Sequence, residues 1–451
     1  MPRRGLRRRT NAMTERHAAT AHAGAPALAT ITVPAVHTRF ERLQADVTII
    51  GGGIVGGAAA LFLQRFGLSV VLLERGVCGA AASGVNYGGV RVQGRGPDQL
   101  PLALRSRELW EQLPALIGID GEYVRSGHLK LARSEADLAS LEAYRPVARE
   151  HGLALEIIAG ARFRQAYPFF GASAIGGSWC PGDGHANPRL VSPAFARAAQ
   201  RAGARVIEHC EATEIGHTGE AFIVGDGRSL EVQSRWLLNC AGAWALKVAQ
   251  AFRDEAPLSA IHPGMAVTEP VPRFLEVNVG VEGGGIYGRQ TARGNCVMGG
   301  SRGVAQGELY ARPAAKAIGE LCQRMGELFP TLRHAQVIRF WSGYEGSLPD
   351  HQPVVGPSPG LPQLIHAFGF SGAGFQTGPA IGEALAEMVH RGASRVPLAP
   401  FSISRFAPPP PPPRRAPSAP HTAPPAAAPA APPSALRGAA PAPASPPPAN
   451  P

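Results

Sequence analysis

Residues 46–75 read DVTIIGGGIVGGAAALFLQRFGLSVVLLER, an apolar run that enters a glycine cluster and returns to a second apolar run. The β-branched residues 47–50 predict a buried strand, and the alanine-rich stretch after the glycines predicts a helix that stops near Gly67. Residues 68–73 predict a second strand. This order of strand, glycine turn, helix and strand is typical of a nucleotide-binding α/β unit.

The glycine cluster has the spacing G-x-G-x-x-G at Gly51, Gly53 and Gly56. The first glycine permits a tight turn, the second lets backbone N–H groups approach a diphosphate, and the third lets the helix pack closely on the strand. Glu74 ends the second strand, where a carboxylate accepts hydrogen bonds from adenosine ribose hydroxyls and disfavours a 2′-phosphate. The strand before the glycines, the helix after them and the acid at the end of the second strand all match a dinucleotide-binding unit. We therefore expect a dinucleotide site rather than a glycine turn without a ligand.

The formal net charge of +11 lies mainly at the two ends of the 451-residue chain. Residues 1–44 hold eight Arg against two Glu, and residues 407–451 hold three Arg and no acid. The part between them is nearly neutral, so we expect no nucleic-acid partner. Hydrophobic residues make up 45% of the chain, which suits a globular α/β protein with a substantial core.

Both ends are expected to lie outside the folded part. Residues 1–44 are interpreted as a basic, disordered extension, and one hypothesis places the true start at Met13, so that residues 1–12 are absent from the native protein. Residues 407–451 are rich in Pro and Ala and cannot bury enough apolar surface to fold. We therefore predict a disordered tail there.

Cysteine and histidine placement gives no sign of a disulfide framework or a metal site, so we expect no metal. The widely spaced cysteines favour free thiols in a reducing cytoplasm, which is the predicted location. The glycines make residues 47–63 a poor membrane span, and we expect none elsewhere. His185 and His366 stand beside glycines, where a lone histidine is more often structural than catalytic.

The loop AASGVNYGGVRVQGR at residues 81–95 extends the glycine motif, and no second fingerprint for a nicotinamide cofactor follows it. At this point the sequence resembles the D-amino-acid oxidase/glycine oxidase/sarcosine oxidase superfamily of FAD-dependent amine oxidoreductases. The resemblance covers about residues 45–402. Further segments that carry it, in the order of the family, are 182–215, 236–245, the Pro-Asp-x-x-Pro-x-x-Gly signature in 342–357, and 366–389.

The resemblance implies an α/β fold with a Rossmann-like FAD-binding domain, discontinuous in sequence, and a second α+β substrate domain built on an antiparallel sheet. The implied segments of the FAD-binding domain are 45–105, 182–258 and 338–402. Those of the substrate domain are 106–181 and 259–337. Alternating residues over 266–303 predict antiparallel strands, and helical stretches near 98–116, 134–151 and 312–328 are expected to pack around them. The pattern looks closest to sarcosine oxidase β subunits and to proline or opine dehydrogenases.

FAD is the implied cofactor. It is expected to be noncovalent, because Ala186 and Gly343 stand where some relatives carry the residue that attaches the flavin. A loop at residues 369–374 would point a helix N-terminus at the flavin pyrimidine carbonyl and stabilise charge on the reduced ring. The implied cofactor-binding residues are Gly51, Gly53, Ile54, Val55, Gly56, Glu74, Arg75, Ser83, Asn86, Tyr87, Gly88, Gly89, Ala212, Ala241, Gly242, Gly369, Phe370, Ser371, Gly372, Ala373, Gly374 and Phe375.

The family reaction moves a hydride from the carbon beside a substrate nitrogen to flavin N5 and leaves an imine that water hydrolyses. It needs a positioned neutral amine and, in the relatives, a cation that grips the substrate carboxylate. Here the sequence departs from its relatives. Glu345 stands where glycine oxidase-like enzymes carry Arg, and Gln376 stands where monomeric sarcosine oxidase-like enzymes carry Lys.

We expect another cation to replace the missing ones. Arg91 and Arg95 are the leading candidates, and Arg289 is the next. For Arg91 this function is evenly weighed against an ordinary salt bridge or a solvated side chain. For Arg95, and for Arg289 beside Tyr287, the ordinary structural role is favoured. Glu345 is hypothesised to bind a second cationic group on the substrate. The candidate catalytic residues are thus Arg91, Tyr287, Arg289, Glu345 and Gln376.

Three functions stay open at this point. The first is an FAD-dependent dehydrogenase or oxidase for a small amine or amino acid of the D-amino-acid, sarcosine, proline or opine type. An NAD-linked dehydrogenase is disfavoured by the flavin-type C-terminal loop. An accessory FAD-carrying subunit, inactive without a heteromeric partner, would explain the missing carboxylate-binding Arg. The electron acceptor, whether oxygen, quinone or a partner protein, is left open, although the missing Lys slightly favours a dehydrogenase.

Overall fold

The computed structural model describes residues 40–407. The expectations for the basic segment up to residue 39, including the start at Met13, lie outside the described residues, as does the tail expected over 408–451. Within the described part, the helices are too short or too polar to cross a membrane.

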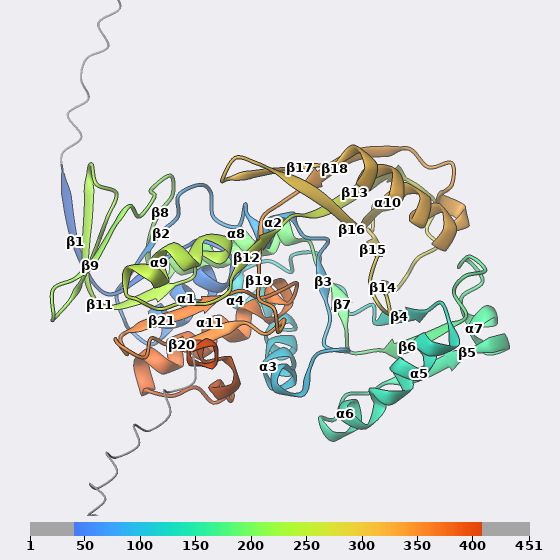
Figure 1. Ribbon diagram of the computed structural model, residues 1–451, viewed down its shortest axis with the longest axis horizontal. Coiled ribbons are helices and arrows are strands. Elements are labelled where there is room, and N and C mark those ends of the chain that lie inside the picture. The colour runs from blue at the N-terminus through green and yellow to red at the C-terminus, as the bar shows by residue number, and fades with distance from the viewer. Residues whose placement is uncertain (1–39, 408–451) are drawn as a thin grey trace, which may run out of the picture. The chain divides into compact units, whose positions relative to one another are not determined.

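The first sheet is built around the strand that precedes the glycine turn (Figure 1). In spatial order its strands are β20 (Val354–Pro357), β21 (Leu364–Phe368), β11 (Leu230–Asn239), β1 (Glu41–Ile50), β2 (Val70–Leu73) and β8 (Arg205–Ile207). All neighbours pair in parallel except β20 with β21. An antiparallel ribbon of β9 (Glu214–His217) and β10 (Phe222–Gly225) continues from β11. The strands around the glycine turn are therefore those of a Rossmann-like sheet, as predicted.

Small residues let the helices of this part pack closely. The helix after the glycine turn lies against two others, and the three are α1 (Ile54–Arg65), α8 (Pro188–Arg201) and α11 (Gly374–Arg391). A Cβ added at Gly382 would lie 2.5 Å from the Ala58 Cβ, and one at Gly57 would lie 3.0 Å from the Ala196 nitrogen. The alanine-rich stretch thus serves close helix packing. A shorter helix, α9 (Ala245–Ala251), contacts β9 and β11.

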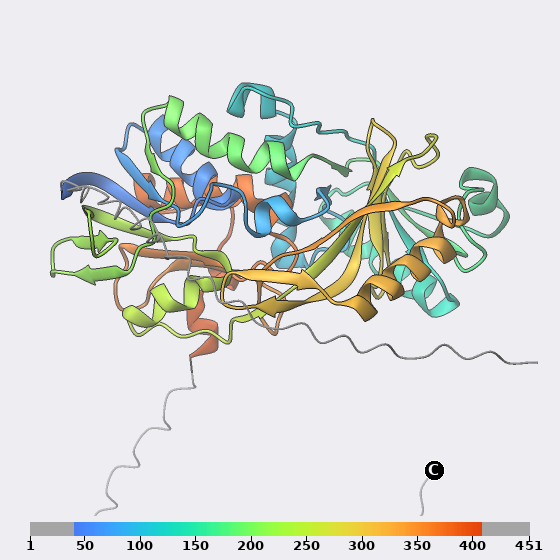
Figure 2. The same cartoon turned by 90° about the horizontal axis from the view of Figure 1, so that it is seen from above.

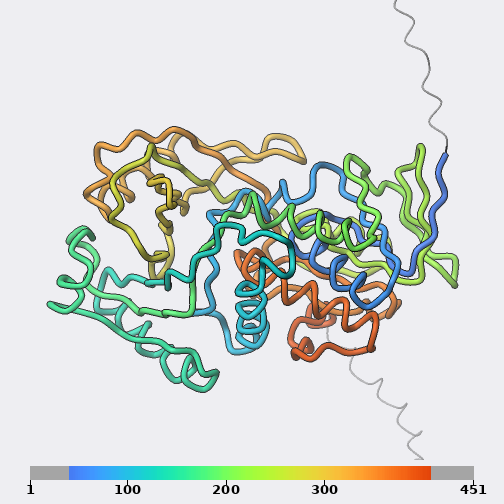
Figure 3. The backbone as a smooth tube through the Cα atoms, turned by 180° about the vertical axis from the view of Figure 1, so that it is seen from behind, coloured from blue at the N-terminus to red at the C-terminus, as the bar shows by residue number. Residues whose placement is uncertain are grey.

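A second, mostly antiparallel sheet joins two separate parts of the chain. Its strands in spatial order are β18 (Val337–Ser342), β13 (Pro263–Pro270), β16 (Asn295–Gln306), β15 (Tyr287–Gln290), β14 (Asn278–Val281), β4 (His128–Ala132), β6 (Gly176–Cys180) and β5 (Glu156–Ala159), with β17 (Tyr310–Pro313) beside β16. The pair β14 and β4, where the two parts meet, is parallel. Figure 3 shows the teal and gold parts of the chain gathered at this sheet, and the blue, green and red parts at the other.

The remaining elements are short. Around the second sheet lie α5 (Glu135–Ala143), α6 (Arg145–Glu150), α7 (Gly160–Ala166) and α10 (Ala315–Leu328). Two small antiparallel ribbons pair β3 (Gly89–Val90) with β7 (Gly184–His185), and β12 (Ser259–Ile261) with β19 (Glu345–Ser347). The other helices are α2 (Ala82–Val85), α3 (Leu100–Trp110) and α4 (Leu113–Ile117). The predicted fold class, an α/β protein with two sheets of these kinds, is confirmed.

Three details differ from the predicted segments. Strand β1 begins at Glu41 and pairs with Leu230, so residues 41–44 belong to the first sheet and not to the N-terminal extension. Strand β18 pairs with β13, so residues 338–342 belong to the second sheet. Helix α3 was expected against that sheet, but it packs on α11 instead, where Arg105 forms two 2.7 Å hydrogen bonds with the Glu383 carboxylate.

His366 is a structural residue of the first sheet. Its ring is fully buried on β21, with Nε2 lying 2.9 Å from Asp254 Oδ2 and Nδ1 lying 3.1 Å from Asn239 Nδ2. Desolvation acts to raise the pKa of Asp254, but hydrogen bonds from His366 and Ser358 outweigh it and hold the pKa below its usual value. This network ties β21 to β11 and to the segment after α9.

We predict that Asp254→Asn destabilises the protein by about 1–3 kcal/mol at neutral pH, because a buried charge-assisted hydrogen bond is lost. Since folding lowers the pKa of Asp254, its contribution is complete above about pH 4 and disappears as the pH falls through the lower folded value. Thermal unfolding between pH 3 and 7 should therefore show the two proteins converging in acid. The exposed Asp98→Asn is the control, and a difference that persists unchanged in acid would contradict the assignment.

Candidate functional site

A cavity of about 520 Å³ opens at the carboxyl ends of β1 and β2. Its walls come from the glycine turn, the loop around α2, the segments after β8 and β11, strand β19 and the loop before α11. The predicted cofactor-binding residues that line it are Gly51, Gly53, Ile54, Val55, Glu74, Arg75, Ser83, Asn86, Ala212, Ala241, Gly242, Gly369, Phe370, Gly372, Gly374 and Phe375. Segments distant in sequence thus form one cavity, at the sheet edge where α/β proteins bind ligands.

The glycine turn needs glycine for two steric reasons. Gly51 has φ = 107°, and a Cβ added there would overlap the Cys240 carbonyl oxygen of the neighbouring strand. A Cβ added at Gly56 would overlap the Gly51 carbonyl oxygen. The turn therefore brings the N-terminus of α1 close to β11 and leaves a concave backbone surface that suits a diphosphate.

Glu74 is held in place by backbone groups at the edge of this surface. Its Oε2 accepts a hydrogen bond from the Gly52 N–H at 2.7 Å, and its Oε1 accepts one from the Gly76 N–H at 2.8 Å. Each carboxylate oxygen can accept a further hydrogen bond. The oriented carboxylate is thus able to accept ribose hydroxyls, as its position after β2 predicted.

The opposite wall is the loop that precedes α11. Gly369 has φ = 73° and Ser371, which is not a glycine, has φ = 48°. The Ser371 hydroxyl accepts the Leu348 N–H at 3.1 Å and fixes this turn from outside the cavity. Helix α11 then begins at Gly374 with its N-terminal turn in the cavity wall. The positive end of an 18-residue helix dipole therefore faces the cavity.

A long hairpin reaches across from the second sheet and contacts the cavity wall (Figure 2). At its tip, between β16 and β17, the Glu308 carbonyl oxygen accepts the Trp244 indole N–H at 2.9 Å and the Glu308 carboxylate lies 2.9 Å from Lys247 Nζ. The Tyr344 hydroxyl donates to the Gly307 carbonyl oxygen at 2.5 Å. Trp244, Lys247 and Tyr344 all line the cavity, so the hairpin tip secures three wall residues.

Sequence reasoning did not assign these three wall residues to the site. Trp244 lies two residues after Gly242 of the predicted turn, and this position in the sequence was the available signal. In the structure the Arg75 guanidinium carbon lies 3.6 Å from the centroid of the Trp244 ring. Tyr344 precedes Glu345 in segment 342–357, which offered a similar signal, whereas Lys247 lies two residues after segment 236–245 and carries no motif. Their place depends on a hairpin that starts on the other sheet.

A second group of predicted residues meets at Tyr87. The Tyr87 and Tyr287 ring centroids lie 4.6 Å apart, and Arg289 Nε donates to the Tyr87 carbonyl oxygen at 2.7 Å. Burial raises the pKa of the Tyr87 phenol, whereas the charges of Arg91, Arg95 and Arg289 act to lower it. Arg289 thus contacts the Tyr87 backbone, and we call Arg91, Arg95 and Arg289, whose charges all act on the Tyr87 phenol, the arginine cluster.

Glu345 connects the arginine cluster with the cavity. It lines the cavity, and its carboxylate accepts a hydrogen bond from the Gly372 N–H. Burial raises the pKa of Glu345, whereas Arg302 and Arg95 act to lower it. The Glu345 charge in turn adds to the burial that raises the pKa of Tyr287. Glu345 thus lines the cavity, and the Arg95 charge of the cluster acts on its carboxyl group.

Gln376 lies away from the cavity, in contrast to its predicted catalytic place. Its Nε2 donates to the Ala103 carbonyl oxygen at 2.8 Å. The backbone carbonyl oxygen of Gln376 accepts the Ser106 hydroxyl at 2.5 Å and the Trp110 indole N–H at 2.8 Å. Phe375 lines the cavity, whereas the Gln376 side chain is bonded to α3. Gln376 therefore belongs to the packing of α3 on α11.

The other predicted residues do not line the cavity. Arg91 lies outside the lining, and its guanidinium donates to the Gln93 carbonyl oxygen. A Cβ at Gly88 would overlap the Ala186 carbonyl oxygen, which explains a glycine there. The predicted cofactor residues that do not line the cavity are Gly56, Tyr87, Gly88, Gly89, Ser371 and Ala373.

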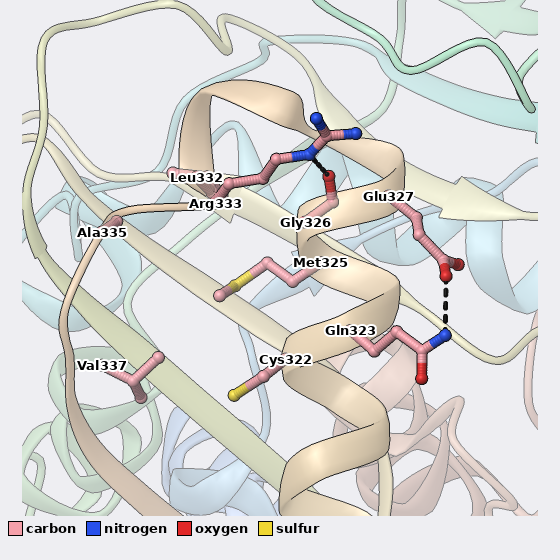
Figure 4. Close-up of a pocket in the computed structure, with 9 residues that line it drawn as sticks. All are labelled: Cys322, Gln323, Met325, Gly326, Glu327, Leu332, Arg333, Ala335 and Val337. Atoms are coloured by element: carbon pink, nitrogen blue, oxygen red, sulfur yellow. Dashed lines mark hydrogen bonds between the residues drawn. The ribbon is translucent and has the colours of Figure 1, made fainter.

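A smaller hollow of about 300 Å³ lies beside α10, away from this site (Figure 4). Its polar groups are already engaged with one another: Gln323 donates to Glu327 at 2.8 Å and Arg333 Nε donates to the Gly326 carbonyl oxygen at 3.2 Å. No converging polar groups remain for a small ligand among the residues drawn, so the larger cavity is the candidate site.

We predict that Gly51→Ala unfolds at a lower temperature and retains little FAD, because both its φ and its Cβ are unfavourable. Gly67→Ala is the matched control, since Gly67 has φ = 79° but nothing within 4 Å of an added Cβ. The control should lose about 1–2 kcal/mol for the positive φ alone. Thermal unfolding and flavin absorbance of the purified proteins measure both effects. Equal losses in the two variants would contradict the predicted overlap with Cys240.

We also predict that Trp244→Phe releases FAD about five-fold faster, because it removes one hydrogen bond of about 1 kcal/mol to the hairpin tip. Flavin fluorescence after dilution measures the rate of release. Tyr310→Phe changes a largely exposed residue of the same hairpin and should leave the rate unchanged. A Trp244→Phe rate equal to that of the Tyr310→Phe control would show that the tip does not hold this wall.

Comparisons with known proteins agree with the geometry. The family described as FAD dependent oxidoreductase, DAO, matches residues 46–388. Glycine oxidase of Geobacillus kaustophilus is 28% identical over 372 residues, covering 80% of this chain and 97% of that protein. Sarcosine oxidase subunit beta of Rhizobium meliloti is 27% identical over 370 residues, covering 80% and 88%.

A solved structure, L-proline dehydrogenase from P. horikoshii, superimposes with a TM-score of 0.74 at 25% identity and covers 81% of this chain and 98% of that one. The glycine turn, the oriented Glu74 and the helix end at Gly374 suit a dinucleotide with a flavin ring. The family match spans well over half of the chain, and the residues present fit its cofactor. This protein therefore belongs to the FAD dependent oxidoreductase (DAO) family, and FAD is its cofactor.

Proposed function

We propose that the protein oxidises the C–N bond of a small amine or amino acid and produces an imine that water hydrolyses. When bound, FAD supplies the hydride acceptor at its N5 atom. The observation that carries the proposal is the 2.7 Å hydrogen bond from Arg289 to the Tyr87 carbonyl oxygen, which holds a buried cation one residue after Asn86 in the cavity wall. Cations at that place suit a substrate that carries a carboxylate beside its amine.

The charges of this region also suit the protonation state that the reaction needs. An amine donates a hydride from its neighbouring carbon only when its nitrogen is neutral, because the lone pair stabilises the developing imine. Positive charge on Arg95 and Arg289 disfavours a substrate ammonium group nearby. His185 adds no charge, since burial and the Arg289 charge lower its pKa to about 3. We propose that the cluster binds the carboxylate and favours the neutral amine.

The helix end at the cavity has a complementary role. Helix α11 places its N-terminal turn at Gly374 and Phe375 in the cavity wall. Its positive end stabilises negative charge that develops on a reduced cofactor. Tyr287 stays a neutral phenol, because burial and the Glu345 charge raise its pKa. It is therefore a hydrogen-bond donor beside the cluster rather than a base.

A second candidate function is an accessory FAD-carrying subunit that works only with a partner. Two observations favour it. One of the similar proteins is a sarcosine oxidase subunit beta. Among the described residues that line the cavity, Arg75 is the only Arg, so the cavity wall lacks a second Arg that would bind a substrate carboxylate. In that case the protein would bind FAD, but amines alone would not reduce it.

The test is anaerobic reduction of the FAD-loaded full-length protein. D-amino acids, sarcosine, glycine, proline, hydroxyproline and opines are added in turn while the flavin absorbance is recorded. Bleaching by one of them, followed by detection of the carbonyl product, is the expected result. If bleaching occurs only after a partner subunit is added, the accessory function is correct. If the loaded protein is reduced by dithionite but by no amine under either condition, the proposal is wrong.

A further inference from the structure

One carboxylate of the cavity wall stands apart from the others. Among the described residues, the acids that line the cavity are Glu74, Glu211 and Glu345. Glu74 accepts two backbone N–H groups at the edge of the glycine turn, and Glu211 follows Cys210, whose N–H donates to the Glu74 carbonyl oxygen. These two acids therefore lie together at the end of β2, whereas Glu345 lies on β19.

A backbone contact orients the Glu345 carboxylate. Gly372, in the loop before α11, also lines the cavity, and its N–H donates to Glu345 Oε1. Oε2 has no hydrogen-bond partner among residues 40–407, and the residue is only half-buried. Each carboxylate oxygen can accept hydrogen bonds. One oxygen is thus fixed by the chain, and the other is free to contact a ligand in the cavity.

The ribbon of β12 and β19 places Glu345 where the chain passes from one sheet to the other. Glu345 pairs with Ile261, and β13 of the second sheet begins two residues later at Pro263, opposite Arg302. From the first sheet, the N-terminal turn of α11 lines the same cavity. Glu345 therefore lies beside the positive helix end for which the proposed function gives a role in stabilising the reduced cofactor.

The other titratable side chains of this region are poorly suited to take a proton from an amine. Tyr287 is already a protonated phenol, because burial and the Glu345 charge raise its pKa. His185 is a weak base, because burial lowers its pKa to about 3. His262 joins β12 to β13 and packs against the Tyr344 ring, with centroids 4.4 Å apart, and it is not among the described residues that line the cavity.

Glu345 has the opposite tendency. Burial raises the pKa of its carboxyl group, although the Gly372 N–H, Arg302 and Arg95 act to lower it. A carboxylate with a raised pKa is a stronger base. This direction agrees with the geometry, in which an oriented carboxylate lines the cavity with one oxygen unengaged.

We propose that Glu345 binds the ammonium group of the substrate and takes its proton as the catalytic base. The inference rests on the proposed function and adds a catalytic residue to it. The N–H bond breaks, an O–H bond forms at Oε2, and the electron pair stays on nitrogen as its lone pair. The lone pair then forms the C=N bond as the hydride leaves the neighbouring carbon with two electrons for FAD, the oxidant. The product is a protonated imine, and Glu345 returns its proton to water.

This role differs from the expectation that Glu345 binds a second cationic group, because the reacting amine itself is the cation. An alkyl amine has a pKa of about 10, so almost all of it is ammonium in neutral water. A carboxylate both attracts this ion and removes its proton, which produces the neutral amine that the reaction needs. The arginine cluster, in contrast, can attract only the substrate carboxylate.

The first test follows anaerobic flavin reduction by a bleaching amine at pH 7 and pH 10. Glu345→Gln keeps the side-chain shape and an oxygen for the Gly372 N–H, but it cannot take a proton. We expect reduction at pH 7 to be about 100-fold slower than in the wild type, as general-base catalysis of this kind implies. The loss should shrink to about three-fold or less at pH 10, where the solution itself supplies neutral amine.

The exposed Glu276→Gln is the control and should match the wild type at both pH values. A loss of equal size at pH 7 and pH 10 would overturn the inference, because a purely structural role does not depend on the protonation of the amine. So would a Glu345→Gln protein that is reduced as fast as the wild type at pH 7.

The second test measures binding without turnover. 2-Aminoisobutyrate and pivalate each carry one carboxylate and differ by an ammonium group in place of a methyl group. Neither has a hydrogen on its central carbon, so neither yields an imine. Flavin absorbance of the holoprotein reports their binding. We expect 2-aminoisobutyrate to bind about 10-fold more tightly to the wild type, as one charged hydrogen bond implies, and Glu345→Gln to reduce this preference to about two-fold or less.

The two tests separate this inference from the proposed function. Reduction by an amine, with equal binding of the two probes and a loss in Glu345→Gln that does not vary with pH, would keep the proposed function and reject the role of Glu345. A preference for 2-aminoisobutyrate that depends on Glu345, without reduction by any amine, would keep the ammonium site and reject the proposed function.

Discussion

The contact on which this structure depends is that between the glycine turn and the neighbouring strand. Gly51 passes so close to the Cys240 carbonyl oxygen that no side chain fits between them, and Gly56 passes equally close to Gly51. This backbone-to-backbone approach allows β1, β11 and the start of α1 to meet at one point. The cavity opens at that point, so its shape follows from a steric constraint on three short segments.

Around this point the chain alternates between two sheets, and the alternation produces the site. Neither sheet alone holds both the arginine cluster and the cofactor cradle, by which we mean the cavity around the glycine turn. The hairpin of β16 and β17 starts on the second sheet and secures Trp244 and Tyr344 beside the first. Arg289 likewise comes from the second sheet and binds the carbonyl oxygen of Tyr87, which follows the glycine turn in sequence. The two binding regions are thus held together by contacts between distant segments.

The distribution of charge gives the two regions different chemistry. At the cradle, the ends of α1 and α11 supply partial positive charge from backbone dipoles, which suits an anionic cofactor without burying a charged side chain. At the cluster, Arg95 and Arg289 are buried guanidinium groups, and the Arg95 Nε has no hydrogen-bond partner among the described residues.

The sequence by itself determined the cofactor cradle and the fold class. Its signals there are local: glycines at fixed spacing, an acid after β2 and an apolar strand, each acting on residues close in the chain. Only the tertiary structure decided the rest. The Gln376 side chain turns towards α3, where the Ala103 carbonyl oxygen accepts its Nε2, and no local pattern shows that. Whether an Arg is paired, solvated or buried without a partner depends on residues far away in sequence. The burial and hydrogen bonding of Arg91, Arg95 and Arg289 therefore follow from tertiary packing, which a single sequence does not show.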